Sequence, residues 1–365
     1  MKYKYLPIVN WVKKGIEDKT FKAGDKLPTE DELIKKFSCG RYTARQAISA
    51  LEEEGLVNRI QGSGSYIAPS EVENETQQNS SNIIGVIIRN NRVHIFPEVF
   101  RGISEQLSSH GYLMNIFITD NDYIKERQAI ENVLAMNPAG IILEPAGSPL
   151  VPYNQPIYEE LSKKIPLISF HGRVSDNTPY IPLQGRKGTQ KLARYLIDHG
   201  HTKIGSLYCM DEYTVISRYM GFKDEMAANG LEISEENTLW IRRNLLSDIF
   251  SDNGNLAVDR MIKNVSAVIC HDDRIAYELI KYLHSKNIRV PEDISVVGYD
   301  NADIFTDTDI RLTTIAHPKA KYGENVANGI LELINDPDAF SISKYAVEPE
   351  LIEGNSVSCM DQHSI

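Results

Sequence analysis

The alternation of short apolar runs with amphipathic segments after residue 82 constrains the fold more than any other feature of this sequence. Seven such runs occur, at residues 83–88, 112–119, 140–143, 167–170, 204–208, 267–270 and 294–299. Most of the segments between them repeat their apolar residues at helical spacing, as 99–110 and 188–199 do. Continuous apolar strands separated by helices are typical of a parallel sheet covered on both faces. Residues 83–365 exceed one doubly wound unit, so the pattern predicts two α/β lobes.

The same pattern indicates where a ligand would bind. In open α/β sheets ligands bind beyond the carboxyl ends of the strands, so the residues just after the apolar runs are the candidates. Polar side chains stand at four of these positions, namely Glu144, His171, Asp272 and Asp300. A structural role is the alternative to ligand binding for an aspartate at a strand end, because such a residue often caps the next helix. We weigh the two explanations equally for Asp273 and favour the ligand for Asp272.

Residues 69–82 separate the α/β region from a different N-terminal segment. They contain almost nothing that can be buried, so they cannot offset the entropy of ordering and are predicted to be a flexible linker. The chain therefore divides into a head, residues 1–68, and a body, residues 83–365. The head holds 12 basic and nine acidic side chains, which gives a net charge of +3. The rest of the chain holds 27 basic and 41 acidic side chains, which gives a net charge of −14. A mildly basic head on an acidic body fits a DNA-binding domain.

Two short helices joined by a tight turn are predicted within the head. Thr29 and Glu32 have the spacing of a capping box, which starts the first helix. Residues 38–40 break that helix, and a second helix begins at Arg41 and runs to about Glu54. This arrangement is a helix-turn-helix.

The second helix has a packing face and a polar face. Apolar residues at positions 44, 47, 48 and 51 follow the helical repeat and are predicted to face the core. The opposite side carries Arg41, Tyr42, Arg45, Gln46 and Ser49. Arginine can bond guanine in a bidentate way and glutamine can do the same to adenine, so this face suits the major groove of DNA. By composition alone, a solvated face on a structural helix is an equally good explanation.

Residues 55–67 favour the DNA-binding explanation. Two short strands flank a glycine-containing turn at residues 61–64, which predicts a β-wing. Glycine lets the backbone come close to a phosphate or a groove edge. A dinucleotide-binding loop is excluded, because neither a third glycine nor a following helix is present.

Three segments of the head together resemble the GntR winged-helix signature, over nearly all of residues 4–67. They are Gly24-x-x-Leu27-Pro28-Thr29-Glu30, Arg41-x-Thr43-x-Arg45-x-Ala47 and Gly62-x-Gly64-Ser65-Tyr66. The resemblance implies that Arg41 and Arg45 read bases or grip phosphate and that Thr43 contacts phosphate. It implies further DNA contacts for Lys4, Glu30, Gln61 and Gly62, the last two at a wing tip in the minor groove. Gly40 stands where the family usually has Ser or Thr, so one possible phosphate contact is lost.

The body resembles the LacI/GalR effector domain, which has the type I periplasmic binding fold. The matching segments are His199-Gly200-His201, Arg218-x-x-Gly221-Phe222 and residues 271–276, 290–300 and 312–315. A polyhydroxylated ligand needs carboxylates that accept hydrogen bonds from its hydroxyl groups and an arginine that donates hydrogen bonds to them. It also needs an apolar or aromatic surface against the C–H faces of its ring. The candidate effector-binding residues are Phe96, Glu144, His171, Arg218, Asp272 and Asp300. A hydrogen-bonded cleft residue without ligand contact is an equal alternative for His171.

A GntR head on a LacI-type body resembles the arabinose-responsive repressors. The shared details are Tyr5 and residues 28–30, 95–97, 144–145 and 348–352. The resemblance implies a homodimer joined through the bodies, which L-arabinose releases from operator DNA. Another pentose or hexose is the second choice of effector.

Other classes of protein fit less well. Residues 1–20 contain no continuous apolar run, so no secretory signal is expected, and no stretch approaches the ~18 apolar residues of a membrane span. The four cysteines have no metal-ligand spacing and indicate free thiols in a reducing cytoplasm, without metal or cofactor. A sugar-processing enzyme using Asp272, Asp273, Asp300 and His171 is an unfavoured rival, because no nucleophile motif accompanies them. An exported transport protein would need the missing signal.

Overall fold

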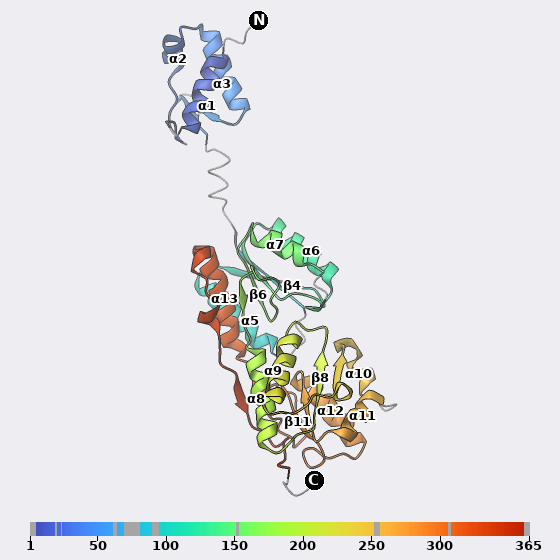
Figure 1. Cartoon of the computed structure of the whole chain (residues 1–365). Coiled ribbons are helices and arrows are strands. Elements are labelled where there is room, and N and C mark those ends of the chain that lie inside the picture. Colours follow the sequence, from blue (N-terminus) through green and yellow to red (C-terminus); the bar gives the residue numbers. More distant parts are fainter. Residues whose placement is uncertain are drawn as a thin grey trace. The chain divides into compact units, whose positions relative to one another are not determined.

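The computed structural model describes residues 5–18, 20–22, 24–60, 64–68, 81–89, 95–150, 153–251, 256–305 and 308–360 (Figure 1). It divides into two compact units, Met1–Ser80 and Ser81–Ile365. Residues 69–80 of the predicted linker lie outside the described residues. The last two predicted linker residues instead begin the first strand of the body, because the amide and the hydroxyl of Ser81 both donate to the carbonyl oxygen of Asn137 at 3.0 Å. The body therefore starts two residues earlier than the sequence predicts.

The head has the helix-turn-helix and the two wing strands that the sequence predicts. Its described elements are α1 (Leu6–Glu17), α2 (Glu30–Phe37), α3 (Arg41–Glu53), β1 (Val57–Ile60) and β2 (Gly64–Ile67), with the two strands antiparallel. The capping box is formed: the Thr29 amide donates to Glu32 Oε2 at 2.7 Å, and the Glu32 amide donates to Thr29 Oγ1 at 3.4 Å. Gly40 provides no side-chain cap for α3. The core includes Ile8, Leu33 and Leu51, all nearly fully buried.

Lobe 1 of the body is a parallel sheet with helices on both faces. Its strands in spatial order are β4 (Leu113–Ile118), β3 (Ser81–Ile88), β5 (Pro138–Leu143), β6 (Leu167–Phe170) and β7 (Tyr180–Ile181). Its helices are α5 (Phe96–Ser109), α6 (Tyr123–Ala135), α7 (Gln155–Ser162) and α13 (Lys319–Asn335). Alternate residues of β3 enter two apolar clusters, one with α5 and α13 and one with α6 and α7. Successive strand residues point to opposite faces, so each face of the sheet is covered by a helix pair.

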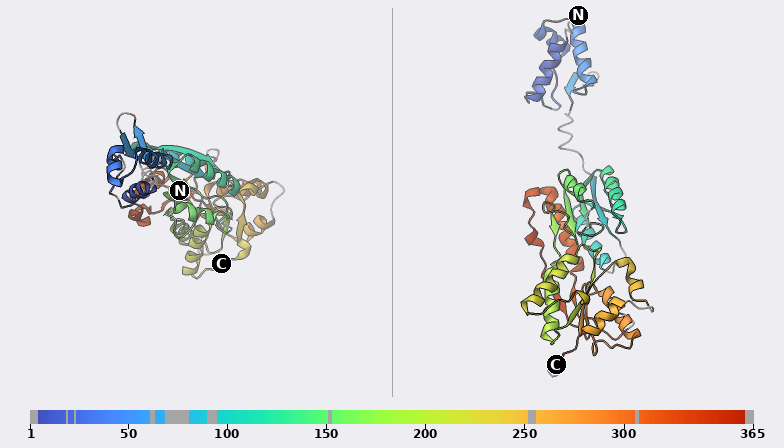
Figure 2. Two further views of the ribbon diagram at one scale, coloured as in Figure 1. Left: turned by 90° about the horizontal axis from the view of Figure 1, so that it is seen from above. Right: turned by 45° about the vertical axis from the view of Figure 1, so that its right-hand side comes forward.

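Helix α13 comes from the C-terminal part of the chain yet packs against α5 and the lobe 1 sheet (Figure 2). Two glycines allow this close approach. A Cβ on Gly102 would lie 2.1 Å from the carbonyl oxygen of Ala320, and one on Gly323 would lie 2.0 Å from that of Val99. Any larger residue at either position would separate the helices. Lobe 1 is therefore completed by a helix that lies more than 200 residues after α5 in the sequence.

Lobe 2 repeats the design with a four-stranded parallel sheet. Its strands in spatial order are β11 (Ser295–Val297), β10 (Ala267–Cys270), β8 (Ile204–Cys209) and β9 (Thr238–Ile241). Its helices are α8 (Gly185–Asp198), α9 (Val215–Ala228), α10 (Leu246–Ile249), α11 (Leu256–Asn264) and α12 (Asp273–Ser285). The antiparallel pair β12 (Thr314–Ala316) and β13 (Glu350–Ile352) packs beside α8. The chain crosses between the lobes before α8, after β12 and before β13.

The two-lobed α/β prediction is confirmed, and each of the seven apolar runs contains a strand. The sequence did not reveal β7 or β9, which are short edge strands and form no long apolar run. In the part of the chain that the structure describes, no helix combines the length and the hydropathy needed to cross a membrane.

Candidate DNA-reading surface and ligand cleft

Helix α3 places the predicted DNA-reading side chains on one open face. Its packing face is buried as the sequence predicts, at Ala44, Ala47, Ile48 and Leu51. On the other side, Arg41, Arg45 and Gln46 are exposed and Thr43 is half-buried. Tyr42 exposes 78% of its surface, an unusual value for an aromatic side chain. The helix therefore presents planar hydrogen-bonding groups that the fold of the head does not itself use for packing.

Ion pairs orient the arginines of this face. Arg41 Nη2 lies 2.8 Å from Asp31 Oδ1. Glu30, at the first turn of α2, holds two arginines: Arg45 Nε at 3.0 Å and Arg59 Nη2, from β1, at 2.9 Å. Glu30 thus joins the two helices and the wing strand, and the sequence did not point to Arg59. The remaining predicted DNA contacts, Lys4, Gln61 and Gly62, lie outside the described residues.

The carboxyl ends of the strands in both lobes of the body border a cleft of about 580 Å³. Five of the predicted effector residues line it: Phe96, His171, Arg218, Asp272 and Asp300. Glu144 is buried behind His171 and does not line the cleft. The structure therefore brings five of the six predicted residues together at one cleft and places Glu144 behind its surface.

His171 is the central group of the lobe 1 wall. It follows β6 in a left-handed backbone conformation with φ of 54°. Its Nδ1 lies 3.0 Å from Glu144 Oε1, and its Nε2 lies 3.2 Å from Nε2 of His317. Its ring stacks on Tyr322 at 5.1 Å. Phe96 lies edge-on to it, and because that ring is only 2% exposed, it offers a ligand little more than an edge.

Arg218 and Asp300 form a buried ion pair on the lobe 2 wall. Arg218 Nη2 lies 3.1 Å from Asp300 Oδ1, Nη1 donates to the carbonyl oxygen of His271, and the guanidinium lies 3.8 Å above the Tyr299 ring. Burial raises the pKa of Asp300 to about 7, against the opposing effect of Arg218. Burial also lowers the pKa of His271 to about 3, so its ring is neutral. Arg218 Nε and His271 Nδ1 are buried and have no hydrogen-bond partner among the described residues.

The structure corrects the assignment of the helix cap at α12. Asp272, not Asp273, is the N-cap: its Oδ1 accepts from the Ile275 amide at 2.9 Å. Its other oxygen pairs with Arg243. Asp273 is the first helical residue, and its buried carboxyl group accepts from Thr314 Oγ1 at 2.7 Å and from the Ala302 amide at 2.6 Å. The helix begins one residue earlier than the capping explanation for Asp273 requires.

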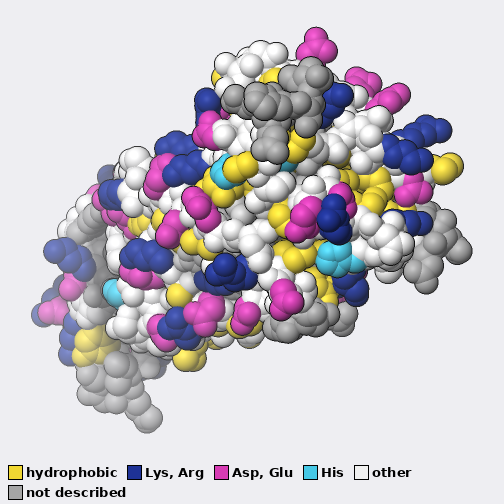
Figure 3. All heavy atoms as spheres, turned by 90° about the horizontal axis from the view of Figure 1, so that it is seen from below, with side chains coloured by type: hydrophobic (Ala, Val, Ile, Leu, Met, Phe, Trp, Pro, Cys, Tyr) yellow, Lys and Arg dark blue, Asp and Glu magenta, His cyan; other side chains and the backbone are white. Residues whose placement is uncertain are grey.

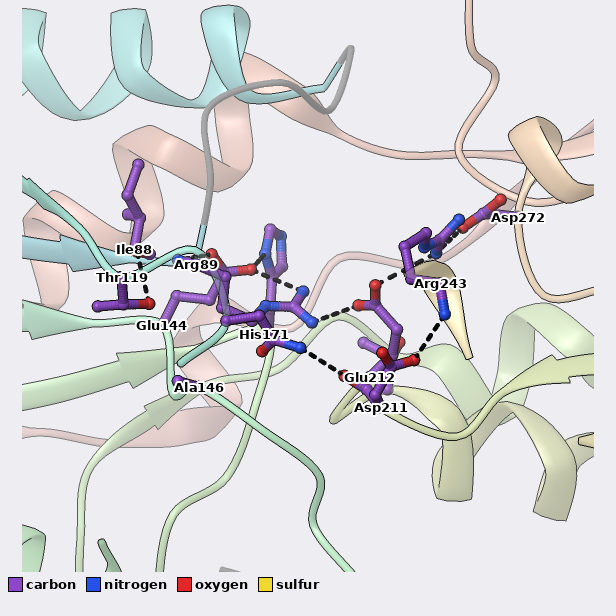
Figure 4. Close-up of polar contacts among 12 residues, drawn as sticks. Ile88, Arg89, Thr119, Glu144, Ala146, His171, Asp211, Glu212, Arg243 and Asp272 are labelled. Atoms are coloured by element: carbon purple, nitrogen blue, oxygen red, sulfur yellow. Dashed lines mark hydrogen bonds and ion pairs between the residues drawn. The ribbon is translucent and has the colours of Figure 1, made fainter. Parts of the chain in front are cut away.

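Sequence reasoning missed several charged residues of the cleft, among them Arg89, Glu212 and Arg243. Arg89 and Glu212 follow β3 and β8, so the strand-end rule could have identified them. Arg243 follows β9, a strand that the sequence did not reveal. Figure 4 shows how these residues join Glu144 of lobe 1 to Asp272 of lobe 2 in a chain of alternating charges.

A winged helix-turn-helix and a two-lobed α/β body with a polar cleft define a class, the ligand-responsive transcription regulators. Residues 4–67 match the family model described as bacterial regulatory proteins of the gntR family. Residues 193–357 match the model of a periplasmic binding protein-like domain. The chain belongs to the transcriptional repressors that join a gntR-type helix-turn-helix domain to a LacI-type, periplasmic-binding-protein-like domain.

The similar proteins are transcriptional regulators, not enzymes. The chain is 28% identical to the arabinose metabolism transcriptional repressor of Geobacillus stearothermophilus, over 98% of this chain and 99% of the relative. It is 30% identical to the HTH-type transcriptional repressor PurR of Vibrio cholerae, over 80% and 85% of the two chains. A LacI-family sugar-binding regulator from Escherichia coli, solved with phosphate, shares the fold of the body with a TM-score of 0.64 at 23% identity, over 77% and 100%.

Proposed function

We propose that this chain is a repressor that leaves its operator DNA when L-arabinose enters the cleft of the body. The observation that carries the proposal is the lobe 2 wall, where a buried arginine donor and a carboxylate acceptor stand side by side at Arg218 and Asp300. This combination suits vicinal hydroxyl groups. The choice of L-arabinose is supported by the name of the full-length relative from Geobacillus stearothermophilus. Such a repressor acts in the cytoplasm, where operator DNA lies.

The head supplies the DNA contacts in this proposal. The exposed side of α3 enters the major groove, with Arg45 and Gln46 at base edges and Arg41, Tyr42 and Thr43 at bases or phosphates. Lys4, Gln61 and Gly62 extend the contact, the latter two through the wing. Glu30 sets the direction of the Arg45 guanidinium. On the face drawn in Figure 3, basic and acidic side chains of the described residues are intermixed, so this face attracts phosphate less than a purely basic surface would.

A homodimer joined through the bodies completes the proposal. Strand β4 is an edge strand of its sheet and exposes Leu113, Ile116 and Ile118 by 60%, 38% and 43%. An exposed apolar sheet edge is a favourable pairing surface for a second copy. Two heads held by a dimer would bind the two halves of a pseudo-palindromic operator. Sedimentation equilibrium of the full chain gives the oligomeric state directly.

The proposed release of DNA is a linkage between two binding equilibria. Without sugar, the dimer presents its heads at a spacing that suits the operator. Sugar stabilises a lobe arrangement that suits the operator less, and it shifts the equilibrium only by its differential affinity for the two arrangements. A gel-shift series with a panel of pentoses and hexoses tests this. Operator affinity that stays constant while calorimetry shows sugar binding would contradict the linkage, and release by another sugar would replace L-arabinose.

Replacing Arg45 with alanine tests the role of α3. Loss of a bidentate base contact should cost about 1–3 kcal/mol of binding free energy, roughly 5- to 150-fold in operator affinity, and should relax base preference at that contact. Fluorescence anisotropy on operator variants measures both effects. Arg101→Ala is the control, because Arg101 is an exposed, ion-paired arginine on α5 of the body. Wild-type operator affinity in Arg45→Ala would contradict the assigned role.

Sugar binding should strengthen as the pH rises through 7. Burial raises the pKa of Asp300 from its ordinary value near 3.8 to about 7, so the carboxyl group is largely protonated at pH 6 and ionised at pH 8. A ligand that donates hydroxyl hydrogens to Asp300 binds the ionised form better, so calorimetry should show about tenfold tighter binding at pH 8 than at pH 6. The raised pKa has the opposite effect on folding: stability falls as the pH rises from about 4 to 7, because the unfolded chain releases this proton near pH 4 whereas the folded chain keeps it up to about pH 7. Asp300→Asn should flatten both profiles.

A further inference from the structure

Glu212 lies between arginines from opposite lobes. It follows β8 in lobe 2, and its Oε1 lies 3.2 Å from Arg243 Nη2 of the same lobe. Its Oε2 pairs with Nη1 of Arg89, which follows β3 in lobe 1 (Figure 4). The side chains of Arg89, Glu212 and Arg243 are 11%, 16% and 27% exposed. Each oxygen of one carboxylate thus has its own guanidinium, within the cleft.

Two guanidiniums converging on one carboxylate form the arrangement by which proteins bind carboxylate and phosphate ligands. Here a side chain of the protein itself occupies that position. Burial would raise the pKa of Glu212, but Arg89 and Arg243 outweigh it and lower the pKa to about 2, so the group is fully ionised near neutral pH. The position between the arginines is therefore permanently filled by an anion.

The other buried arginine contacts in the cleft are also balanced by the chain. Arg89 also pairs with Glu144 at 2.9 Å, Arg243 with Asp272, and Arg218 with Asp300. At the cleft surface a negatively charged ligand would meet four carboxylates, those of Asp120, Glu212, Asp272 and Asp300. Arg89, Arg218 and Arg243 are each already paired, whereas Arg274, the fourth arginine of the lining, is exposed at the surface of the molecule. Bringing an unpaired anion into such a site is unfavourable, because the low dielectric strengthens its repulsion by the carboxylates. A neutral ligand does not encounter this cost.

We propose that Glu212 is a specificity-determining residue, whose carboxylate fills an anion-binding position between Arg89 and Arg243 and so restricts the cleft to uncharged polyhydroxylated ligands. The identity of the neutral ligand rests on the proposed function. The filled anion position does not, because it follows from the contacts among the three side chains.

Removing the Glu212 carboxylate should reverse the preference of the cleft for uncharged over negatively charged ligands. Glu212→Ala leaves two guanidiniums facing a space of carboxylate size, whereas Glu212→Gln fills the same space with an uncharged amide and is the matched control. Calorimetry at pH 8 compares L-arabinose with L-arabinonate, which carries a carboxylate at C1. We expect wild type to prefer the sugar by at least about 100-fold, and Glu212→Ala to bind L-arabinonate at least about tenfold tighter than wild type does. Glu212→Gln should show no such gain.

A second measurement is independent of any sugar. Formate is a carboxylate small enough for the vacated position, and a ligand that binds the folded state raises its thermal midpoint. About 100 mM formate, compared with chloride at equal ionic strength, should raise the Tm of Glu212→Ala and leave that of wild type and Glu212→Gln unchanged. If no sugar binds wild type but formate stabilises Glu212→Ala, the proposed function fails and the filled anion position stands.

The inference is overturned by either of two results. One is wild-type protein that binds L-arabinonate as tightly as L-arabinose. The other is a folded Glu212→Ala, verified by circular dichroism, that gains neither L-arabinonate affinity nor formate stabilisation. If Glu212→Ala does not fold, the comparison of L-arabinose with L-arabinonate on the wild-type protein still tests the inference. A filled anion position requires the wild type to bind the neutral sugar more tightly.

Discussion

Arg218→Met should abolish the response to sugar while leaving the operator bound. Arg218 is 3% exposed, donates to the His271 carbonyl and to Asp300, and lies over the Tyr299 ring. Methionine keeps much of the apolar contact but removes every donor and leaves Asp300 without its cation. We expect sugar affinity to fall at least about 100-fold, which corresponds to roughly 2.7 kcal/mol of binding free energy. Calorimetry measures the loss, and gel shifts should show repression that sugar no longer relieves.

The same substitution should also reduce stability. Removing one partner of a buried ion pair leaves an uncompensated group and costs roughly 3–5 kcal/mol of folding free energy. Protonation of Asp300 limits that cost, because the pKa of its carboxyl group is already raised. Arg218→Lys keeps the charge but not the planar fork, so it should recover stability more than sugar affinity. Release of the operator at wild-type sugar concentrations by a folded Arg218→Met protein would exclude this residue from the site.

Deletion of residues 1–67 should separate the two activities completely. The shortened chain keeps the whole unit Ser81–Ile365, with the apolar clusters of both lobes and the lining of the cleft. Sugar affinity should therefore stay within about twofold of the full chain, since no described cleft residue belongs to the head. Operator affinity, which for specific regulators is typically 10⁻⁸–10⁻¹¹ M, should fall below detection at ~10 μM protein.

Anisotropy with labelled operator and calorimetry with L-arabinose measure the two quantities on the same preparation. A shortened chain that is folded but does not bind L-arabinose would show that sugar binding in the cleft requires the head. Salt-sensitive operator binding by the shortened chain would place the DNA-reading surface on the body and would contradict the role of α3.

The local elements of the site were predictable because their signals are local. Apolar runs of four to eight residues predicted strands, and polar residues just after a run predicted positions in the cleft for His171, Asp272 and Asp300. The capping box at Thr29 and Glu32 depends on a three-residue spacing and formed as expected. Arg218 was found through its resemblance to a family position rather than through any local pattern.

Contacts between distant segments were not predictable in the same way. Glu144 also follows a strand, but the contact of its carboxylate with Arg89 and His171 turned it behind the cleft surface. Asp272 was expected at the ligand and is also the cap of α12. Arg59 reaches Glu30 from 29 positions away, and Glu212 reaches Arg89 from 123 positions away. No repeat of apolar or polar residues in the sequence indicates which distant charged residues will pair.

The sequence alone therefore determined the order of the strands with long apolar runs and of the helices between them, the division into a head and an α/β body, and the strand ends that border the cleft. Hydrophobic periodicity and capping act over a few residues, so one chain segment is enough to specify them. Only the tertiary structure decided which charges pair across the two lobes. That choice depends on the distance between side chains that the fold brings together, and the strength of each pair depends on how much water the fold excludes.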